Sequence, residues 1–276
     1  MTQAETALHV RFGQTLSAHP ILEDPHLARV LGRRTHRKYR DEPVARDLVE
    51  ALLHVAFSAS AKSDYQQASV VIVERADTRR RIADLVPSMP WIGSAPVFLI
   101  FCADAERLER VCALRGRPYP NRNLEAFFNA SVDAALVMQT FVLAAEHVGL
   151  GCCPISVIRN HLAEITSILS LPERVIPVAG VCVGYPAEDG HVSMRLPPTV
   201  TRHVDRYGER DFAGEIDAYD RRRAERARTP REKQRSPERF GYADFYGWSE
   251  DKCRQLHGDE GSGFGALVRS RGFTLD

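Results

Sequence analysis

The chain has 276 residues, of which 44% are hydrophobic and 26% charged, close to the averages of soluble globular proteins. Its 37 Lys and Arg side chains balance 36 Asp and Glu, so the formal net charge is only +1 and the molecule as a whole is not an electrostatic binder of nucleic acid. These values exclude the disordered and collagen-like classes, and a chain of this length buries a substantial core without disulfides or metals.

The sequence predicts neither a membrane anchor nor a secretion signal. Its longest purely apolar stretches, 95–103 and 175–183, are shorter than the ~20 residues that cross a bilayer. The first residues contain no basic segment followed by an apolar one, which predicts a cytoplasmic protein. The six cysteines form no C-x-x-C pair, so we expect reduced, structural thiols and no metal site.

Helices with one apolar face and strands without polar alternation are predicted in the first hundred residues. Asp24 and Pro25 begin a short helix that Gly32 ends, and Pro43 opens a second helix with apolar residues at helical spacing. The predicted elements here are helices at 25–31, 43–56 and 77–86, a polar loop at 58–67, and buried strands at 70–73 and 97–102.

The next predicted helix, 123–148, contains no Gly or Pro and is apolar on nearly all sides. Such a helix belongs in a domain centre or in a subunit interface, and Gly149 is expected to end it. A turn-rich segment at 151–157, a helix at 160–169 and a strand at 176–183 follow. Because strands alternate with helices, the sequence predicts an α/β-like arrangement with both faces of the sheet covered.

The last part of the chain differs in composition from the rest. Residues 221–239 contain nine basic and three acidic side chains and almost no large apolar ones. We therefore predict one domain at 1–207 and, at 208–276, an exposed arm or lid without a core of its own.

Common catalytic motifs are absent from the sequence: G-x-x-x-x-G-K-[ST], H-E-x-x-H and G-x-S-x-G do not occur. Gly149-Leu150-Gly151 lacks the third glycine of the dinucleotide fingerprint and follows a helix, so a Rossmann site is rejected. Four other segments together offer guanidinium groups, small polar side chains and close backbone approach, which suit an anionic, planar cofactor. These segments are 33–37, 60–67, 149–157 and 195–197.

Each segment also has a plainer interpretation. A basic run after a helix is commonly a solvated surface, and Gly149 with Gly151 can be a helix cap and a turn. His36 lies between arginines that oppose its protonation, which favours packing over proton transfer. Cys152 and Cys153 could act as a redox pair, but adjacent cysteines bridge only through a strained ring, which favours inert thiols.

Eight short motifs, in their order along the chain, resemble the nitroreductase superfamily of FMN flavoproteins, and within it the oxygen-insensitive NADPH nitroreductases and flavin reductases. The resemblance extends from about residue 31 to 207 and implies an α+β fold with a mixed sheet between helices. It also implies an obligate homodimer with two FMN sites at the subunit interface and a C-terminal extension that wraps the partner. The motifs are Arg33-Arg34-Thr35-His36-Arg37-Lys38-Tyr39, 60–67, 101–104, Gly149-Leu150-Gly151, 158–160, 171–172, 184–186 and Arg195-Leu196-Pro197.

The resemblance implies which side chains contact FMN. Contacts to its phosphate and ribityl chain are implied for Arg33, Arg34, Thr35, Arg37 and Arg195. Contacts to its ring are implied for Ser60, Ser63 and Gln67, partly from the other subunit, and for Met89, Pro154, Ile155, Ser156 and Val157. Related enzymes often carry His at position 33, Gln at position 89, Gly-Gly at 156–157 and Lys at position 193, so this chain departs from them at these places.

The implied activity is that of an NAD(P)H-dependent oxidoreductase. FMN would pass a hydride from NADPH or NADH to a nitroaromatic, quinone or flavin-type acceptor in ping-pong order, which explains why no catalytic acid, base or nucleophile stands out. The resemblance implies that residues 221–239 occupy the place of a loop that helps related enzymes select NADPH. The alternative interpretation is a solvated arm that only wraps the partner subunit, so the use of NADH stays open. Two alternatives stay open: other flavin chemistry on the same fold, such as reductive dehalogenation, dehydrogenation or flavin fragmentation, and a non-catalytic flavin-binding regulatory protein.

Overall fold

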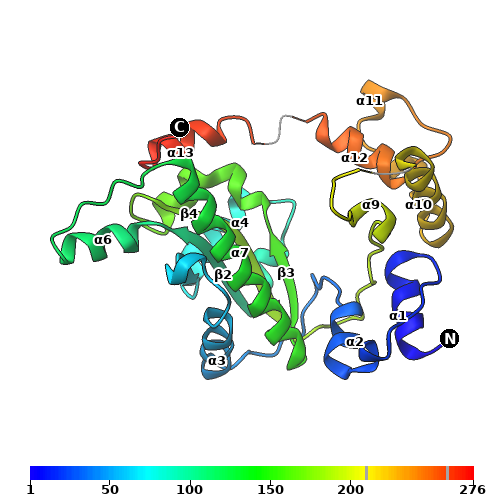
Figure 1. Cartoon of the computed structure of the whole chain (residues 1–276), viewed down its shortest axis with the longest axis horizontal. Coiled ribbons are helices and arrows are strands. Elements are labelled where there is room, and N and C mark those ends of the chain that lie inside the picture. Colours follow the sequence, from blue (N-terminus) through cyan, green and yellow to red (C-terminus); the bar gives the residue numbers. More distant parts are fainter. Residues whose placement is uncertain (209–210, 259–260) are drawn as a thin grey trace. The chain divides into compact units, whose positions relative to one another are not determined.

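The computed structural model describes residues 1–208, 211–258 and 261–276. Figure 1 shows the helices and strands of these residues, and the chain divides into two compact units. The first, called the sheet unit below, consists of Arg34–Gly190 and Gly261–Asp276. The second, called the helical unit, consists of Met1–Arg33 and His191–Glu260.

The sheet unit is built on four strands: β1 (Ala68–Ile72), β2 (Val97–Asp104), β3 (Gly151–Ile155) and β4 (Val175–Gly184). Their order is β1-β2-β4-β3, and every neighbouring pair is antiparallel. β1 and β3 are therefore the two edges of the described sheet. Pro154, which has no N–H to donate, lies on the edge strand β3, where a proline is tolerated.

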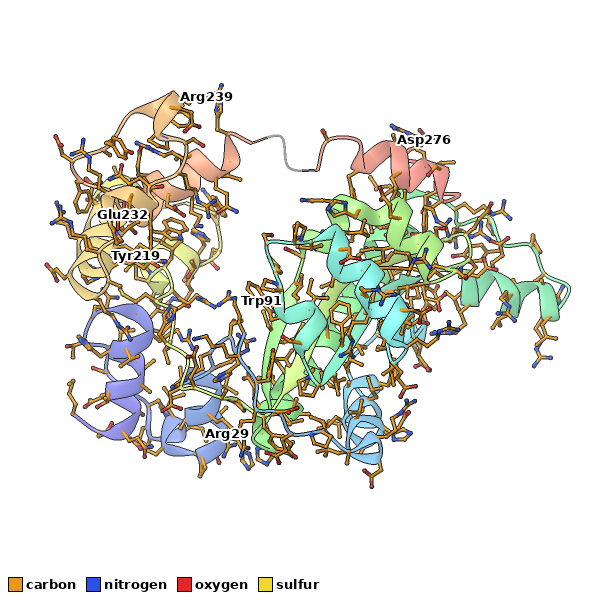
Figure 2. The ribbon with its side chains drawn as sticks, turned by 180° about the vertical axis from the view of Figure 1, so that it is seen from behind. Arg29, Trp91, Tyr219, Glu232, Arg239 and Asp276 are labelled. Atoms are coloured by element: carbon orange, nitrogen blue, oxygen red, sulfur yellow. The ribbon has the colours of Figure 1, made fainter. Side chains whose placement is uncertain are left out.

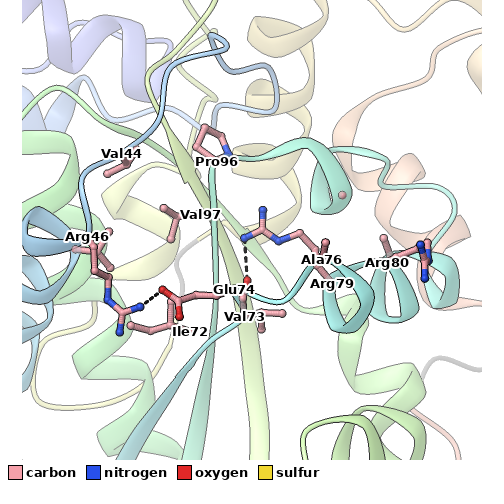
Figure 3. A pocket seen from close by; sticks show the side chains of 13 residues that line it. Val44, Arg46, Ile72, Val73, Glu74, Ala76, Arg79, Arg80, Pro96 and Val97 are labelled. Atoms are coloured by element: carbon pink, nitrogen blue, oxygen red, sulfur yellow. Dashed lines mark hydrogen bonds and ion pairs between the residues drawn. The ribbon is translucent and has the colours of Figure 1, made fainter.

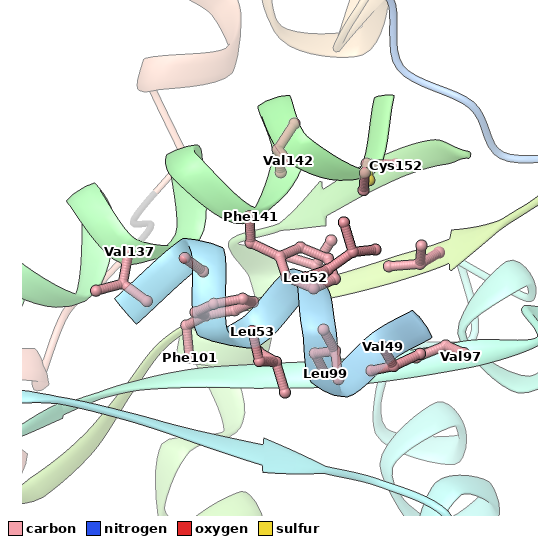
Figure 4. Close-up of a cluster of buried hydrophobic side chains, with 14 of the residues drawn as sticks. Val49, Leu52, Leu53, Val97, Leu99, Phe101, Val137, Phe141, Val142 and Cys152 are labelled. Carbon is pink, nitrogen blue, oxygen red and sulfur yellow. The ribbon is translucent and has the colours of Figure 1, made fainter. Parts of the chain in front are cut away.

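Helices cover both faces of this sheet. Successive side chains of β2 point to opposite faces, so Leu99 and Phe101 enter one hydrophobic cluster while Phe98 and Ile100 enter another. The first face is covered by α3 (Arg46–Phe57) and α7 (Leu124–His147), as Figure 4 shows. The second face is covered by α4 (Ala76–Leu85), α5 (Trp91–Ser94) and α8 (Leu162–Ile168). All eight residues of β2 are buried, which explains the absence of polar alternation.

Helix α7 is the longest element of the sheet unit. Asn123 caps its N-terminus, and its inner face buries Phe141, whose ring centroid lies 5.8 Å from that of Phe101. Its outer face exposes apolar side chains at every fourth position, called the α7 stripe below: Leu124, Phe128, Val132 and Leu136. Length and composition alone would let α7 cross a membrane, but its packed inner face is typical of a core helix in a soluble protein.

The sheet unit is completed by α6 (Glu106–Leu114), α13 (Phe264–Ser270) and the 3₁₀ helices η2 (Lys62–Asp64) and η3 (Val157–His161). The C-terminal segment returns to this unit, because the Arg174 N–H donates to the Arg271 carbonyl at 2.9 Å. Val268 and Phe273 are buried in a cluster with Ala126 and Ala130 of α7. Residues 261–276 therefore contribute to the core.

The helical unit consists of α1 (Gln3–Phe12), α2 (Pro25–Leu31), α9 (Pro198–Thr201), α10 (Phe212–Arg226), α11 (Pro237–Phe240), α12 (Trp248–Leu256), η1 (Pro20–Glu23) and η4 (Arg231–Lys233). Tyr219, buried in α10, meets Trp248 edge-on at 5.5 Å between ring centroids. The buried carboxylate of Asp220 accepts a hydrogen bond from the Ser249 N–H at 3.1 Å, in the first turn of α12. Glu232 and Arg239 of this unit, both labelled in Figure 2, are exposed.

The α+β fold class is confirmed, as are the strands near 70–73, 97–102 and 176–183 and the long helix at 123–148. The turn predicted at 151–157 is wrong: residues 151–155 form β3, because backbone pairing with β4 overrides local turn signals. The four described strands are antiparallel, whereas the resemblance implied a mixed sheet. The helix predicted from Pro43 begins at Arg46, and α1 was not predicted at all.

Candidate functional site

The basic segment after α2 lies alongside β3. The His36 N–H donates to the Cys152 carbonyl at 3.1 Å, so this part of the chain pairs with the outer edge of the sheet. A Cβ on Gly151 would lie 2.8 Å from the His36 ring, so only glycine fits at this place in β3. The Tyr39 hydroxyl lies 2.7 Å from the His36 carbonyl and 3.1 Å from the Cys182 carbonyl. Burial raises the pKa of Tyr39, which keeps the hydroxyl protonated as a donor.

These contacts bring several of the predicted flavin-binding residues together. Met89, Ile155 and Val157 pack in one cluster on the second face of the sheet. The Arg37 guanidinium lies 5.6 Å from the centroid of the Trp91 ring, and Trp91 packs in the same cluster. The sequence analysis missed Trp91 as a contact of Arg37, because an isolated Trp before an apolar strand carries no motif.

The neighbouring predicted residues are placed by backbone contacts. Arg34 donates from Nη1 to the Gly190 carbonyl at 3.0 Å, and the Thr35 carbonyl lies 3.2 Å from where a Gly190 Cβ would stand. Pro154 of β3 is half-buried, and Ser156, which follows β3, is exposed. The segment 34–37 therefore lies along β3, and η3 begins where β3 ends.

The second group of predicted residues lies in the loop that precedes β1. Asp133, which is 1% exposed on α7, accepts the N–H of Lys62 at 2.9 Å and the N–H of Gln67 at 3.1 Å. Between these two attachment points, Ser63, Asp64 and Gln66 adopt positive φ angles of 49°, 58° and 53°. The carboxylate thus fixes a strained loop that displays Ser60 and Ser63. Asp133 was also missed, although an acid in the middle of an apolar helix was a signal that could have found it.

A cavity of about 770 Å³ opens beside this loop. It is lined by Ser60 and Gln67 from the loop, by Phe57, and by Asp133 and Val137 from α7. Gln67 is 2% exposed, and its side-chain oxygen Oε1 has no hydrogen-bond partner among the described residues. A buried amide oxygen without a partner is costly, so this atom is suited to accept a hydrogen bond from a ligand.

Arg107 ties the same loop to β1 and α6. Its Nη2 donates to the Ala68 carbonyl at 3.0 Å and to the Ser69 hydroxyl at 2.6 Å, and it pairs with the Asp104 carboxylate at 2.9 Å. Its Nη1 contacts the Gln66 carbonyl. Both ends of the loop are therefore anchored by charged hydrogen bonds.

The two groups lie at opposite edges of the sheet. The loop at 60–67 leads into β1, whereas the segment 34–37 pairs with β3, and β2 and β4 stand between these edges. Three inter-strand spacings of about 4.8 Å separate the edges by about 14 Å. The loop also rests on α7, while Met89 and Val157 pack on the other face. One chain therefore does not bring both groups to a single planar ligand.

Within the helical unit, Arg11 of α1 joins the segments that carry Arg33 and Arg195. Its guanidinium donates to the Arg33 carbonyl at 2.5 Å and to the Ser193 carbonyl at 2.7 Å. The Arg195 N–H in turn donates to the Arg11 carbonyl at 2.7 Å. Arg33 and Arg195, the two predicted phosphate contacts of this unit, therefore lie in segments that both bond to Arg11.

A second cavity, of about 520 Å³, contains none of the predicted residues (Figure 3). Three of its charged side chains contact other residues of the wall: Arg46 pairs with Glu74, and Arg79 donates to the Val73 carbonyl at 2.9 Å and to the Ala95 carbonyl at 2.5 Å. Burial lowers the pKa of Arg79. Arg79 therefore links α4 to the segments that follow β1 and precede β2, which is a structural role.

The buried thiols are expected to be unreactive in the folded protein. Burial raises the pKa of Cys102 to about 12, with a smaller contribution from Asp104, and burial also raises the pKa of Cys182. Alkylation at pH 8 should therefore label exposed Cys253 rapidly and these two thiols only after unfolding. Peptide mass spectrometry measures the sites, a Cys253→Ser variant should lack the rapid phase, and labelling of native Cys102 would contradict the expectation.

Comparisons with known proteins identify the family. The chain is 34% identical over 197 residues to the FMN reductase [NAD(P)H] of Bacillus subtilis, covering 70% of this chain and 78% of that protein. The family model described as "Nitroreductase family" matches residues 30–185. The chain belongs to the nitroreductase family. This nitroreductase is also 32% identical over 186 residues to the oxygen-insensitive NADPH nitroreductase of Salmonella typhimurium, covering 66% of the chain and 75% of the relative.

Solved structures resemble this nitroreductase over most of its length. NfrA2 from B. megaterium has a TM-score of 0.81 and 28% identity, covering 91% of this chain and 98% of the other. The NADPH:FMN oxidoreductase from Vibrio harveyi, complexed with NAD⁺, has a TM-score of 0.78 and 25% identity, covering 91% and 99%. The resemblance inferred from the sequence motifs is confirmed, and the predicted enzyme class agrees with the names of these relatives.

Proposed function

We propose that this nitroreductase is an NAD(P)H-dependent FMN oxidoreductase. Its relatives are named FMN reductase and NADPH nitroreductase, and the residues of this chain suit FMN. The chemistry that bound FMN supplies is hydride transfer, alternately from a nicotinamide and to an acceptor, which gives ping-pong kinetics. The acceptors we propose are nitroaromatics, quinones and free flavins.

The described residues offer what the two ends of FMN require. Guanidinium groups of Arg33, Arg34, Arg37 and Arg195, with the Thr35 hydroxyl, would hold the phosphate and ribityl chain. The buried oxygen of Gln67, which has no partner among the described residues, would accept a hydrogen bond from the polar edge of the ring. The other proposed ring contacts are Ser60, Ser63, Met89, Pro154, Ile155, Ser156 and Val157.

The observation that carries the proposed flavin site is that its residues are divided between two edges of one sheet. The 60–67 loop leads into β1, whereas the segment 34–37 pairs with β3. A planar ligand reaches both groups when a second copy of the chain supplies one of them, so we propose a homodimer with two shared sites. The α7 stripe supports this proposal, because apolar side chains exposed at every fourth helical position are typical of an interface. In this dimer, residues 211–258 would act as an arm, whereas residues 261–276, which were predicted to belong to it, pack in the core of the sheet unit.

Residues of this chain would orient the reactants and exclude water. The apolar cluster of Met89, Trp91 and Val157 would shield one part of the ring, and fixed cations near the ring would favour the anionic reduced flavin. The basic, mostly exposed run at 221–239 would attract the extra phosphate of NADPH, so we propose that NADPH is preferred to NADH. We place the protein in the cytoplasm, acting on small-molecule acceptors.

The visible absorption spectrum of the purified protein tests this function. We expect flavin bands that bleach on anaerobic addition of NADPH and return when a quinone is added, with parallel reciprocal-rate plots when both substrates are varied. A colourless protein that neither retains added FMN nor oxidises NADPH would refute the proposal. A requirement for oxygen during turnover would instead favour oxygen-dependent flavin chemistry on this fold.

A further inference from the structure

Arg11 makes an unusual set of contacts for a residue of an N-terminal helix. It is 7% exposed, and its guanidinium donates to three backbone carbonyls. Nε and Nη2 bond the Leu31 carbonyl at 3.1 and 2.7 Å, Nη2 also bonds the Arg33 carbonyl at 2.5 Å, and Nη1 bonds the Ser193 carbonyl at 2.7 Å. The planar fork of an arginine can serve three carbonyls at once in this way.

A second contact fixes the same place from the backbone of α1. The Arg195 N–H donates to the Arg11 carbonyl at 2.7 Å, and Gly13, at φ 68°, caps the helix directly against Met194. A Cβ on Gly13 would lie 2.1 Å from the Met194 side chain, so the helix end and the 193–195 segment are in close contact. α1 therefore clamps two segments that are about 160 positions apart in the sequence.

We propose that Arg11 is a positioning residue for the FMN phosphate, an inference that rests on the proposed function. It holds the backbone of Arg33 beside that of Arg195, so that both guanidinium groups are in place before the anion arrives. Preorganised cations bind more tightly because less conformational entropy is lost on binding. Arg11 also adds a third positive charge to this part of the chain. Its helix lies outside the matched family region, 30–185, so the family match does not assign it this role.

The proposal predicts a loss of selectivity for the phosphate group. Riboflavin has the ring of FMN but no phosphate, so the ratio of the two dissociation constants isolates the phosphate contribution. In the Arg11→Ala variant we expect FMN to bind about tenfold more weakly, while riboflavin binding changes less than about twofold. The FMN affinity of Arg11→Lys should lie between those of the wild type and Arg11→Ala, because one ammonium group replaces three separate donor nitrogens.

Flavin-fluorescence quenching with the full-length protein, after removal of its flavin, measures both constants. The matched control is Leu8→Ala, which removes a buried α1 side chain but none of the Arg11 hydrogen bonds. It should lower the melting temperature and leave the FMN to riboflavin ratio unchanged. If Arg11→Ala does not fold, Arg11→Lys and Gly13→Ala carry the test.

The outcomes separate the two proposals. A wild-type protein that binds FMN no better than riboflavin refutes the phosphate site itself, and with it the proposed function of these arginines. A wild-type preference for FMN that persists in both Arg11 variants refutes only the positioning role. Equal weakening of FMN and riboflavin also refutes it, because a loss of general stability affects both ligands alike.

Discussion

Replacing Asp133 by alanine is expected to lower the free energy of unfolding by about 2 to 4 kcal/mol and to abolish FMN retention. The variant leaves the part-buried N–H of Lys62 and the buried N–H of Gln67 without the carboxylate that accepts their hydrogen bonds. Without these two anchors, Ser63, Asp64 and Gln66 should relax from their left-handed backbone angles. Urea unfolding measures the stability, and the flavin absorbance per protein chain measures retention.

Two further variants make this result specific. Asp133→Asn keeps the side-chain size, but its amide nitrogen faces an N–H group, so we expect an intermediate loss of stability. Glu125→Gln removes an exposed acid from the same helix and should change stability by at most about 0.5 kcal/mol. A stable Asp133→Ala protein that retains FMN would show that the loop keeps its shape without the carboxylate.

The elements of the sheet unit could be predicted from the sequence because their signals are local. The helical spacing of Leu48, Leu52 and Ala56 and the unbroken apolar run at 97–102 each depend on a few neighbouring residues. Strand β3 could not be predicted in the same way. Its Gly, Pro and Cys residues favour a turn locally, and only the hydrogen bonds to β4, some 30 residues later, make the segment a strand.

The candidate site was predictable only where a motif marks it. The basic run at 33–37 and the polar loop at 60–67 were predicted as flavin contacts from residue type and order. Asp133, Trp91 and Arg11 were missed, because each acts on a segment that lies far away in the sequence: Asp133 holds a loop about 70 positions earlier, and Arg11 holds Ser193. Their roles depend on tertiary contacts that a single sequence does not display.

A charged side chain introduced into the α7 stripe is expected to dissociate the proposed dimer. Phe128 is 63% exposed at the centre of the stripe, so a Phe128→Glu chain should fold normally as a monomer. In a twofold interface each substitution occurs twice, and two buried unpaired carboxylates at about 3 kcal/mol each would weaken association about 10⁴-fold. Sedimentation velocity at micromolar concentration should show a dimer for the wild type and a monomer for the variant.

The Phe128→Glu variant should lose bound FMN together with its dimeric state. In a monomer the 60–67 loop and the β3 edge remain about 14 Å apart. The control is Leu114→Glu, which places the same charge on an exposed apolar position of α6, outside the stripe. It should remain dimeric and yellow. A monomeric Phe128→Glu protein that still holds FMN would show that one chain forms a complete site, and would locate the flavin contacts at a single edge of the sheet.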